Sequence, residues 1–327
     1  MPKVLITTVP FADKNKLPIE LLKKENISYF INPLGRKLKE NELADMVDDF
    51  DVIIAGTEPI TEKVMMRASK LKLISRVGIG LDSVDLLAAE RLGIQVSYTP
   101  DAPAPAVAEL SVGIMLTLLR YAHIANSRMH QGLWNRYFGR RLSKVTVGII
   151  GAGRIGRGVI DLLASFKPCK ILVNDINSEI KFTSMPWVEH TSKETIYQEA
   201  DLISLHVPLT SETKNMICYD DLKRMKKDAL IINTSRGGII NELDLVKALN
   251  EDHLAGAAID VFEQEPYNGE LQNIERCILT SHMGSMSVDC RSLMEIEATE
   301  EAVRFLTGHP LIGRVPAEEY DVQRKGL

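Results

Sequence analysis

Short runs of Val, Ile and Leu alternate with longer stretches of helical periodicity along most of this chain. A strand covered on both faces by helices is apolar throughout, so this alternation is typical of βα units around a parallel sheet. The pattern therefore predicts an α/β protein with two doubly wound parallel-sheet domains. The predicted strands are residues 3–8, 27–32, 51–56, 71–76 and 94–99, then 146–150, 170–175, 187–191, 202–207, 229–234, 256–261 and 277–282.

Amphipathic segments between the early strands predict helices, and two longer helices follow. The expected helices are 18–24, 40–47, 61–69, 83–91, a long one at 103–121 and a final one at 287–306, before a charged tail. Residues 128–143 are rich in aromatic residues and show no clear period. We expect the helix near residue 110 to join the two units, with the helix near residue 295 as a second connection.

Length, charge and cysteine usage restrict the class of protein. With 327 residues, 45% of them hydrophobic, the chain is long enough for two packed domains. Lys and Arg number 39 against 44 Asp and Glu, so no basic excess favours nucleic acid. The start lacks the pattern of a signal peptide, and the apolar stretch 106–119 is interrupted by Glu109 and too short to span a bilayer. Four scattered cysteines without a CxxC pair suggest a reducing compartment and no metal site. A cytoplasmic protein without a membrane or nucleic-acid partner is expected.

The motif GAGRIG directly follows the predicted strand 146–150 and opens a helix that runs through Leu163. Its three glycines have separate roles. Gly151 allows the tight turn, Gly153 lets the backbone approach a pyrophosphate, and Gly156 permits close packing of helix on strand. Strand and helix on either side favour a dinucleotide site over a simple glycine-rich turn.

Asp175 ends the next predicted strand, nineteen residues after Gly156, where a ribose-binding acid is expected. A carboxylate there accepts hydrogen bonds from the ribose hydroxyls and repels a 2′-phosphate. Ile176, Asn177 and Ser178 offer no cation to hold such a phosphate. The sequence therefore favours NAD over NADP as the cofactor, although a solvated acid at a strand end is the alternative for Asp175 alone.

Three polar residues follow or end strands of the second series: Arg236, Glu265 and His282. Ligands of open α/β sheets bind at the carboxyl ends of strands, so these groups can converge. A histidine can take the proton of an alcohol, a carboxylate can orient its ring, and an arginine can bind a substrate carboxylate. Each also has a simpler explanation, as a solvated arginine, a loop carboxylate or a structural histidine.

Taken in order, GAGRIG, NTSRGG, LAGAAIDVFEQEP and TSHMGS resemble the D-isomer-specific 2-hydroxyacid dehydrogenase family. RVGIGLDSVD, TPDAPAPAVAELSVGIMLTLLR and SLHVPLTSETKNMI extend the resemblance over nearly the whole chain. The resemblance implies a Rossmann NAD-binding domain, residues 100–286, inserted into a flavodoxin-like substrate domain, residues 1–99 and 287–327. It places the active site between the domains and implies an oxidoreductase that interconverts 2-hydroxy and 2-oxo acids.

The resemblance also implies roles for single residues. His282 would be the acid/base, Glu265 its partner and Arg236 the substrate anchor, while a backbone loop would meet the substrate carboxylate. The segment 108–119 resembles the part that forms a dimer in relatives, so a homodimer is expected. The loop is Val77, Gly78, Ile79 and Gly80, and the implied cofactor contacts beside the glycines and Asp175 are Arg154, Ile155, Pro208, Thr234 and Asp260.

Phosphoglycerate dehydrogenases resemble the chain most, through GIGLDSVD and through a C-terminus without an expected regulatory domain. Glu58 and Ser83 depart from that pattern, and Glu58 would repel a phosphate if it faced the substrate. Hydroxypyruvate, glyoxylate and D-lactate therefore remain alternatives to 3-phosphoglycerate. A non-enzymatic NAD-sensing adaptor, similar to corepressors on this fold, keeps the same three residues, but the ends lack Pro- or Ser-rich tails. A Rossmann protein of unrelated function leaves the three residues unexplained.

Overall fold

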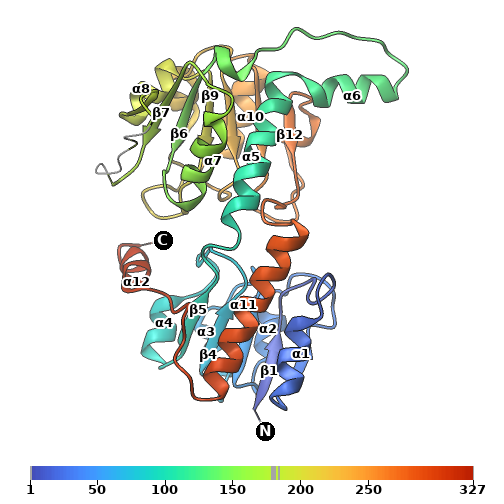
Figure 1. Ribbon diagram of the computed structural model, residues 1–327, viewed down its shortest axis with the longest axis vertical. Helices are drawn as coiled ribbons and strands as arrows, with labels where there is room; N and C mark the ends of the chain where they lie inside the picture. The colour runs from blue at the N-terminus through green and yellow to red at the C-terminus, as the bar shows by residue number, and fades with distance from the viewer. Residues whose placement is uncertain (1, 178–181, 183–184, 327) are drawn as a thin grey trace. The chain divides into compact units, whose positions relative to one another are not determined.

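A computed structural model describes residues 2–177, 182 and 185–326 of the chain. The chain forms two compact units, one of Met1–Pro103 with Met286–Leu327 and the other of Ala104–Ser285 (Figure 1). We call them the outer unit and the inserted unit, because the second lies within the sequence of the first. Each unit is built around its own parallel sheet.

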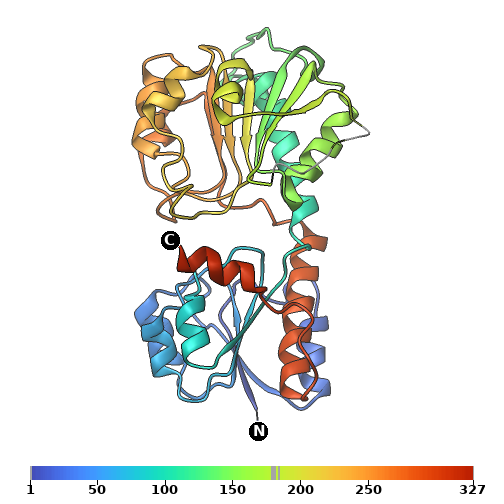
Figure 2. The ribbon, with the colours of Figure 1, turned by 90° about the vertical axis from the view of Figure 1, so that its left-hand side faces the viewer.

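The outer unit holds a five-stranded sheet in the order β2-β1-β3-β4-β5, with all pairs parallel. This is the flavodoxin-like order, in which the chain reverses direction beside β1. Helices α1 and α11 contact each other on one face and α2, α3 and α4 lie on the other (Figure 2). The strands are β1 (Lys3–Ile6), β2 (Ser28–Ile31), β3 (Val52–Ala55), β4 (Leu73–Arg76) and β5 (Gln95–Tyr98). The helices are α1 (Leu17–Lys24), α2 (Glu40–Met46), α3 (Glu62–Arg67), α4 (Leu86–Arg91), α11 (Val288–Leu306) and α12 (Ala317–Arg324).

The inserted unit holds a seven-stranded parallel sheet in the order β12-β11-β10-β9-β6-β7-β8. Its first strand, β6, lies between β7 and β9, which is the Rossmann arrangement. The strands are β6 (Thr146–Ile150), β7 (Lys170–Asn174), β8 (Val188–His190), β9 (Leu202–Leu205), β10 (Leu230–Asn233), β11 (Gly256–Ile259) and β12 (Cys277–Leu279). The helices are α5 (Ala104–Leu119), α6 (Ala122–His130), α7 (Arg154–Ala164), α8 (Lys193–Glu199), α9 (Tyr219–Arg224) and α10 (Glu242–Asn250), with short 3-10 turns at Leu142–Lys144 and Glu270–Asn273.

The apolar strands lie where the sequence pattern requires. Every residue of β3, β4, β9, β10 and β11 is buried, as expected for strands covered on both faces. Helices α5 and α7 approach closely because a Cβ at Gly158 would lie 3.2 Å from the Cβ of Ala108. The predicted α/β fold with two doubly wound sheets is confirmed.

The predicted end of one strand is wrong, and two helices lie in segments for which the sequence pattern predicts none. Strand β12 ends at Leu279, so His282 does not end it but lies three residues beyond. The charged tail contains helix α12, which packs on α4 and whose Gln323 accepts a hydrogen bond from the Leu86 N–H and donates to the Val84 carbonyl. The segment without a period begins inside helix α6, which lacks a buried face that would give it a period.

In the described part of the chain, no single helix has both the length and the apolar character needed to cross a membrane. Helices α5 and α6 reach this length and apolar character only when they are taken together, and a bend of 68° separates them. Half of the residues of α5 are buried against the sheet and α7, which is typical of a core helix.

Candidate active site

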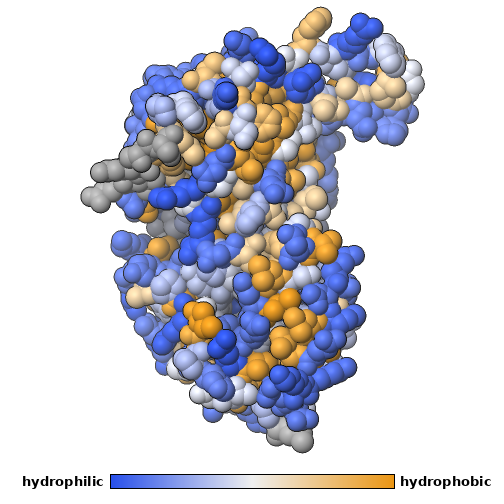
Figure 3. All heavy atoms as spheres, in the orientation of Figure 1, coloured by the Kyte–Doolittle hydropathy of each residue, from blue (hydrophilic) through white to orange (hydrophobic). Residues whose placement is uncertain are grey.

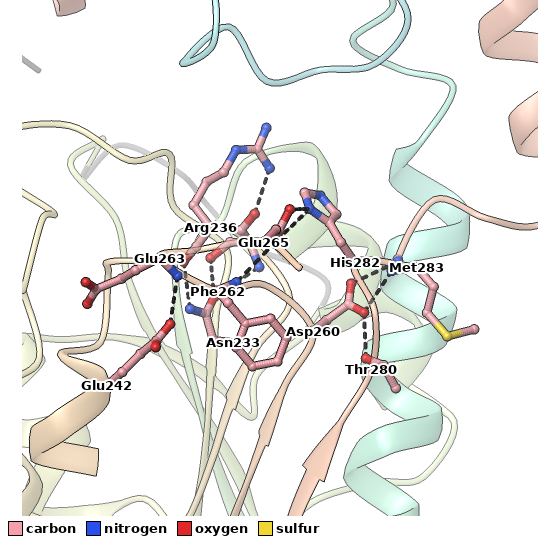
Figure 4. A network of polar contacts seen from close by, with 12 residues as sticks. Asn233, Arg236, Glu242, Asp260, Phe262, Glu263, Glu265, Thr280, His282 and Met283 are labelled. Carbon is pink, nitrogen blue, oxygen red and sulfur yellow. Dashed lines mark hydrogen bonds and ion pairs between the residues drawn. The ribbon is translucent and has the colours of Figure 1, made fainter. Parts of the chain in front are cut away.

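Strands β10, β11 and β12 are neighbours at one side of the inserted unit's sheet, and their carboxyl ends lie together. The loops that follow them carry Arg236, Glu265 and His282 respectively. Figure 4 shows the Arg236 side chain, the Glu265 carboxylate and the His282 ring at this one edge. The structure thus brings together the three residues that the sequence singles out.

His282 and Glu265 form a direct pair. Nδ1 of the imidazole lies 2.9 and 3.0 Å from the two carboxylate oxygens of Glu265. The Phe262 N–H donates to the same carboxylate at 3.3 Å, and the ring of Phe262 stacks on Tyr267, so the loop closes around Glu265. With Nδ1 engaged, Nε2 is the nitrogen available for exchange of a proton with a bound molecule.

The backbone of His282 has a φ of +51°, in the left-handed region that side chains other than glycine rarely adopt. Asp260, which is 1% exposed, stabilises this turn. Its carbonyl accepts from the His282 N–H at 2.7 Å. Its carboxylate accepts from the N–H groups of Met283 and Gly284, both at 2.9 Å, and from the Thr280 hydroxyl at 2.5 Å (Figure 4).

Arg236 lies in a loop that packs directly on the loop of Glu265. A Cβ placed on Gly237 would lie 2.0 Å from the carbonyl carbon and oxygen of Phe262, so only glycine permits this approach. One guanidinium nitrogen of Arg236 donates to the carbonyl of Ser235 at 2.7 Å. Gly237, directly after Arg236, therefore sets how closely the arginine loop approaches the carboxylate loop.

The glycine loop of the inserted unit fits a dinucleotide. Gly151 has a φ of +92°, and a Cβ there would lie 2.4 Å from the carbonyl oxygen of His206. A Cβ on Gly156 would lie 2.0 Å from the carbonyl oxygen of Gly151, whereas nothing lies within 4 Å of one on Gly153. The space beside Gly153 is where a pyrophosphate can approach the start of α7.

Asp175 follows β7 beside this loop. Its carboxylate accepts from the Ala152 N–H at 2.6 Å and from the Asn177 N–H at 2.8 Å, so it is fixed against the glycine loop. Ser178, the last of the three residues weighed for NADP, lies outside the described residues. Of the other implied cofactor contacts, Arg154 and Pro208 are exposed and Ile155 is half-buried.

Thr234 and Asp260 are buried at the ends of β10 and β11. The hydroxyl of Thr234 lies 2.8 Å from that of Ser111 on α5, and the Asp260 carboxylate is occupied by the turn of His282. The N–H donors of the glycine loop and of the helix start, together with the acceptor carboxylate of Asp175, match what NAD requires. No group of three or more His, Cys, Asp or Glu side chains among the described residues is placed to hold a metal ion.

The implied substrate loop lies in the outer unit, after β4. Gly78 has a φ of +132°, and a Cβ there would lie 2.9 Å from the guanidinium of Arg76. The Thr99 hydroxyl accepts from the Gly78 N–H at 2.8 Å, and the Thr99 N–H donates to the Gly78 carbonyl at 3.2 Å. Thr99 therefore fixes this glycine. Val77 is buried, and Ile79 and Gly80 are half-buried.

Sequence reasoning missed the residues that hold the site from behind. Ser111, Asn233, Gly237 and Thr280 contact the candidate site residues or their loops. Asn233 carries a signal in hindsight, because an asparagine at the end of a buried strand must find partners for its amide. The others depend on contacts between distant segments.

His206 lies near the glycine loop and is unsuited to proton transfer. Burial lowers the pKa of His206 to about 4, and its Nε2 lies 2.9 Å from the Ser204 hydroxyl. The unfolded chain therefore binds a proton below its ordinary pKa of 6.5 that the folded chain does not. Stability is full above that pH and is lost as the pH falls toward 4.

We predict that replacing His206 reduces this acid sensitivity. Wild-type protein is expected to lose about 2 kcal/mol of unfolding free energy between pH 7 and 5 through this group. His206→Asn, which does not titrate, should lose correspondingly less, as measured by urea unfolding at both pH values. The exposed His190→Asn is the control and should keep the wild-type slope. Equal slopes for His206→Asn and wild type would contradict the assignment.

Comparison with known proteins assigns the chain to a family. The family model for the NAD-binding domain of D-isomer specific 2-hydroxyacid dehydrogenases matches residues 112–284. The chain is 37% identical to a glyoxylate reductase of Thermofilum pendens over 279 residues, covering 83% of this chain and 82% of that protein. It is 35% identical to a D-3-phosphoglycerate dehydrogenase of Synechocystis over 294 residues, covering 88% of this chain but 53% of that protein.

Among solved structures, the TT0316 protein of Thermus thermophilus superposes with a TM-score of 0.87 at 31% identity, over 96% of this chain and all of that one. The relatives include glyoxylate reductases as well as phosphoglycerate dehydrogenases, so a special closeness to the latter is not shown. The predictions of the family, of an enzyme and of NAD as cofactor are confirmed. The chain belongs to the D-isomer-specific 2-hydroxyacid dehydrogenases, NAD-dependent enzymes that act on the CH–OH group of 2-hydroxy acids.

Proposed function

We propose that this enzyme reduces a short, unphosphorylated 2-oxo acid such as hydroxypyruvate or glyoxylate, with Arg236, Glu265 and His282 as its chemical residues. The observation that carries the reaction is the imidazole–carboxylate pair beside an arginine at one sheet edge. NAD(H) bound at the glycine loop supplies or accepts the hydride. The remaining chemistry is binding of the substrate carboxylate and transfer of one proton.

The proton is held at Nε2 of His282. Glu265 engages Nδ1, which fixes the orientation of the ring. In reduction, Nε2 donates its proton to the substrate oxygen, and in oxidation it takes the hydroxyl proton. Arg236 binds the substrate carboxylate, which its planar guanidinium can meet with two parallel hydrogen bonds.

The outer unit is proposed as the substrate domain, residues 1–99 with 287–327, and residues 100–286 as the NAD-binding domain. Val77, Gly78, Ile79 and Gly80 are proposed to meet the substrate carboxylate with backbone groups. Their support is local: Thr99 and Arg76 fix the loop at Gly78, while the N–H groups of Ile79 and Gly80 make no hydrogen bond to another described residue.

Glu58 supports the choice of an unphosphorylated substrate. It is 1% exposed and follows β3 in the outer unit. Its carboxylate accepts from the Gly56 N–H at 2.9 Å and from the Thr7 hydroxyl, groups that end the neighbouring strands β3 and β1. An anion binding at these strand ends would need the same donors, and the carboxylate already occupies them.

The phosphoglycerate dehydrogenase of Synechocystis, 35% identical, keeps a phosphorylated substrate as the second candidate. D-Lactate is a further alternative among the unphosphorylated acids. A sensing adaptor on this fold would bind NADH without turnover. Kinetics on a panel of acids therefore separates all of these functions.

We predict that His282→Ala lowers kcat for the accepted 2-oxo acid by about 10²–10⁴-fold, because the proton donor is removed. Glu265→Gln should lower it less, since the ring keeps a partner. NADH oxidation gives the rates, and quenching of protein fluorescence gives NADH binding, which should persist in both variants. Unchanged turnover in His282→Ala would remove this histidine from the mechanism.

We predict that hydroxypyruvate or glyoxylate is reduced with higher kcat/KM than 3-phosphohydroxypyruvate. Glu58→Ala removes the charge and vacates the Gly56 N–H and the Thr7 hydroxyl, so it should shift this ratio toward the phosphorylated acid by about tenfold. Glu62→Ala is the control, because the exposed Glu62 carboxylate pairs with Arg91 on the surface. A wild-type preference for the phosphorylated acid would show that Glu58 does not determine specificity.

We further propose a homodimer, supported by residues 122–141, here called the arm. The arm consists of α6 and an extended segment that reaches out from the inserted unit's sheet (Figure 1). Gly139 and Arg140 fasten its end to the carbonyl of Leu119, and Arg128 pairs with Glu275 at 2.5 Å. Trp134 is nevertheless 77% exposed and Phe138 99%, and apolar residues stand among hydrophilic ones on this surface (Figure 3).

A fastened segment that presents large aromatic side chains to water is typical of an interface between proteins. We predict that Trp134→Ala with Phe138→Ala shifts the protein from dimer to monomer in sedimentation velocity at micromolar concentration. Met66→Ala with Leu243→Ala, at 72% and 75% exposure elsewhere, is the matched control and should leave the dimer intact. A wild-type monomer, or a dimer in the arm variant, would contradict the proposal.

A further inference from the structure

We infer that Asn233 is a positioning residue for Arg236, which acts through the main chain rather than by contact with the substrate. The inference rests on the proposed role of Arg236 as the substrate anchor. No sequence motif assigns a role to the asparagine that precedes the TSRGG segment. Its contacts in the structure do.

Asn233 is the last residue of β10 and is 2% exposed. Its side-chain oxygen accepts from the N–H of Ser235 at 3.1 Å and from the hydroxyl of Ser235 at 2.8 Å. Its amide nitrogen donates to the carbonyl of Arg236 at 2.7 Å. One buried side chain therefore holds the peptide group that precedes Ser235 and the peptide group that follows Arg236, so the turn that carries Arg236 is fixed at both ends.

The residue that follows Arg236 is a glycine, and it fixes the loop from the other side. Gly237 packs on the backbone of Phe262 and Glu263 with no room for a Cβ. Arg236 thus lies between a hydrogen-bonded point and a packed point. The backbone of Arg236 therefore has one conformation, which sets the direction of its side chain. Asn233 contributes to this through its hydrogen bond to the Arg236 carbonyl.

The same asparagine is connected to the turn of His282. The carbonyl of Asn233 accepts from the Asp260 N–H at 3.0 Å, and the carbonyl of Asp260 accepts from the His282 N–H at 2.7 Å. A continuous line of hydrogen bonds therefore runs across the ends of three strands, from the Arg236 loop to the imidazole turn. Loss of the amide donor at Asn233 breaks the hydrogen bond to the Arg236 carbonyl. The main-chain hydrogen bonds that lead to the His282 turn remain.

The chain contains a matched control. Asn32 follows β2 in the outer unit and is 4% exposed. Its oxygen accepts from the Leu34 N–H at 2.9 Å, and its amide donates to the Arg36 carbonyl at 2.8 Å. As in Asn233, the side-chain oxygen accepts from an N–H two residues on and the amide donates to a carbonyl of the same turn, with a further bond to the Thr7 carbonyl at 3.3 Å, but this turn carries none of the proposed site residues.

The experiment compares Asn233→Asp with Asn32→Asp in the full-length chain, with hydroxypyruvate and NADH as the probes. Each variant keeps the acceptor oxygen and loses the N–H donor. Asn233→Asp is expected to raise the KM for hydroxypyruvate about tenfold, with the KM for NADH changed less than about twofold. Asn32→Asp should leave both constants unchanged while it lowers thermal stability by a comparable amount.

A double-mutant cycle separates positioning from general damage. In an Arg236→Ala background there is no guanidinium to position, so Asn233→Asp should change the KM for hydroxypyruvate less than about twofold. A tenfold effect in both backgrounds would show a merely structural role and overturn the inference. If Asn233→Asp does not fold, Asn233→Ala, which adds no charge beside Asp260, replaces it in the same cycle.

Failure of the proposed function gives a different result from failure of the inference. If Arg236→Ala leaves the KM for hydroxypyruvate unchanged, the arginine is not the anchor and the proposed function is wrong in that part. If Arg236→Ala raises this KM but Asn233→Asp behaves like Asn32→Asp, the anchor stands and only the inference fails.

Discussion

The carboxyl ends of parallel strands that pair side by side must lie at one edge of their sheet, and the chemistry proposed for this enzyme depends on that geometry. Strands β10, β11 and β12 pair directly, so loops that begin at residues 234, 260 and 280 start next to one another. Three side chains separated by tens of residues in sequence thereby meet at the edge where Figure 4 shows them. The glycine loop after β6 lies at the carboxyl end of a strand of the same sheet and is the proposed site for the cofactor's pyrophosphate.

Pairing of strands brings the loops together, but buried polar groups determine where each side chain points. Asn233 fixes the Arg236 turn, and Asp260 holds His282 in its left-handed backbone conformation. Buried amides and carboxylates are costly unless every group is paired, so each of these turns has few alternative arrangements. The hydrogen bonds of Asn233 and Asp260 offset the cost of burying these polar groups, and the resulting rigidity suits the proposed acid–base chemistry.

Much of this could be predicted from the sequence, because apolar strands and a glycine loop are local signals. The positions of the twelve predicted strands along the sequence, and the place of Asp175 beside the glycine loop, required no tertiary information. The end of β12 was misplaced because the turn around His282 depends on Asp260, twenty-two residues earlier. Helix α12 was missed since its stability comes from packing on α4 and from bonds of Gln323, not from an apolar periodicity of its own. Asn233 and Gly237 act on segments that only the fold brings near.

The most direct test of the central proposal, that this strand-end site reduces a 2-oxo acid, is the chirality of the product. Hydroxypyruvate and NADH are incubated with the wild-type enzyme, and the glycerate formed is resolved by chiral chromatography. A fixed imidazole and a fixed arginine present only one face of the carbonyl to the hydride, and the family is D-isomer specific, so D-glycerate alone is predicted. L-Glycerate or a racemic product would contradict the proposed arrangement of Arg236 and His282.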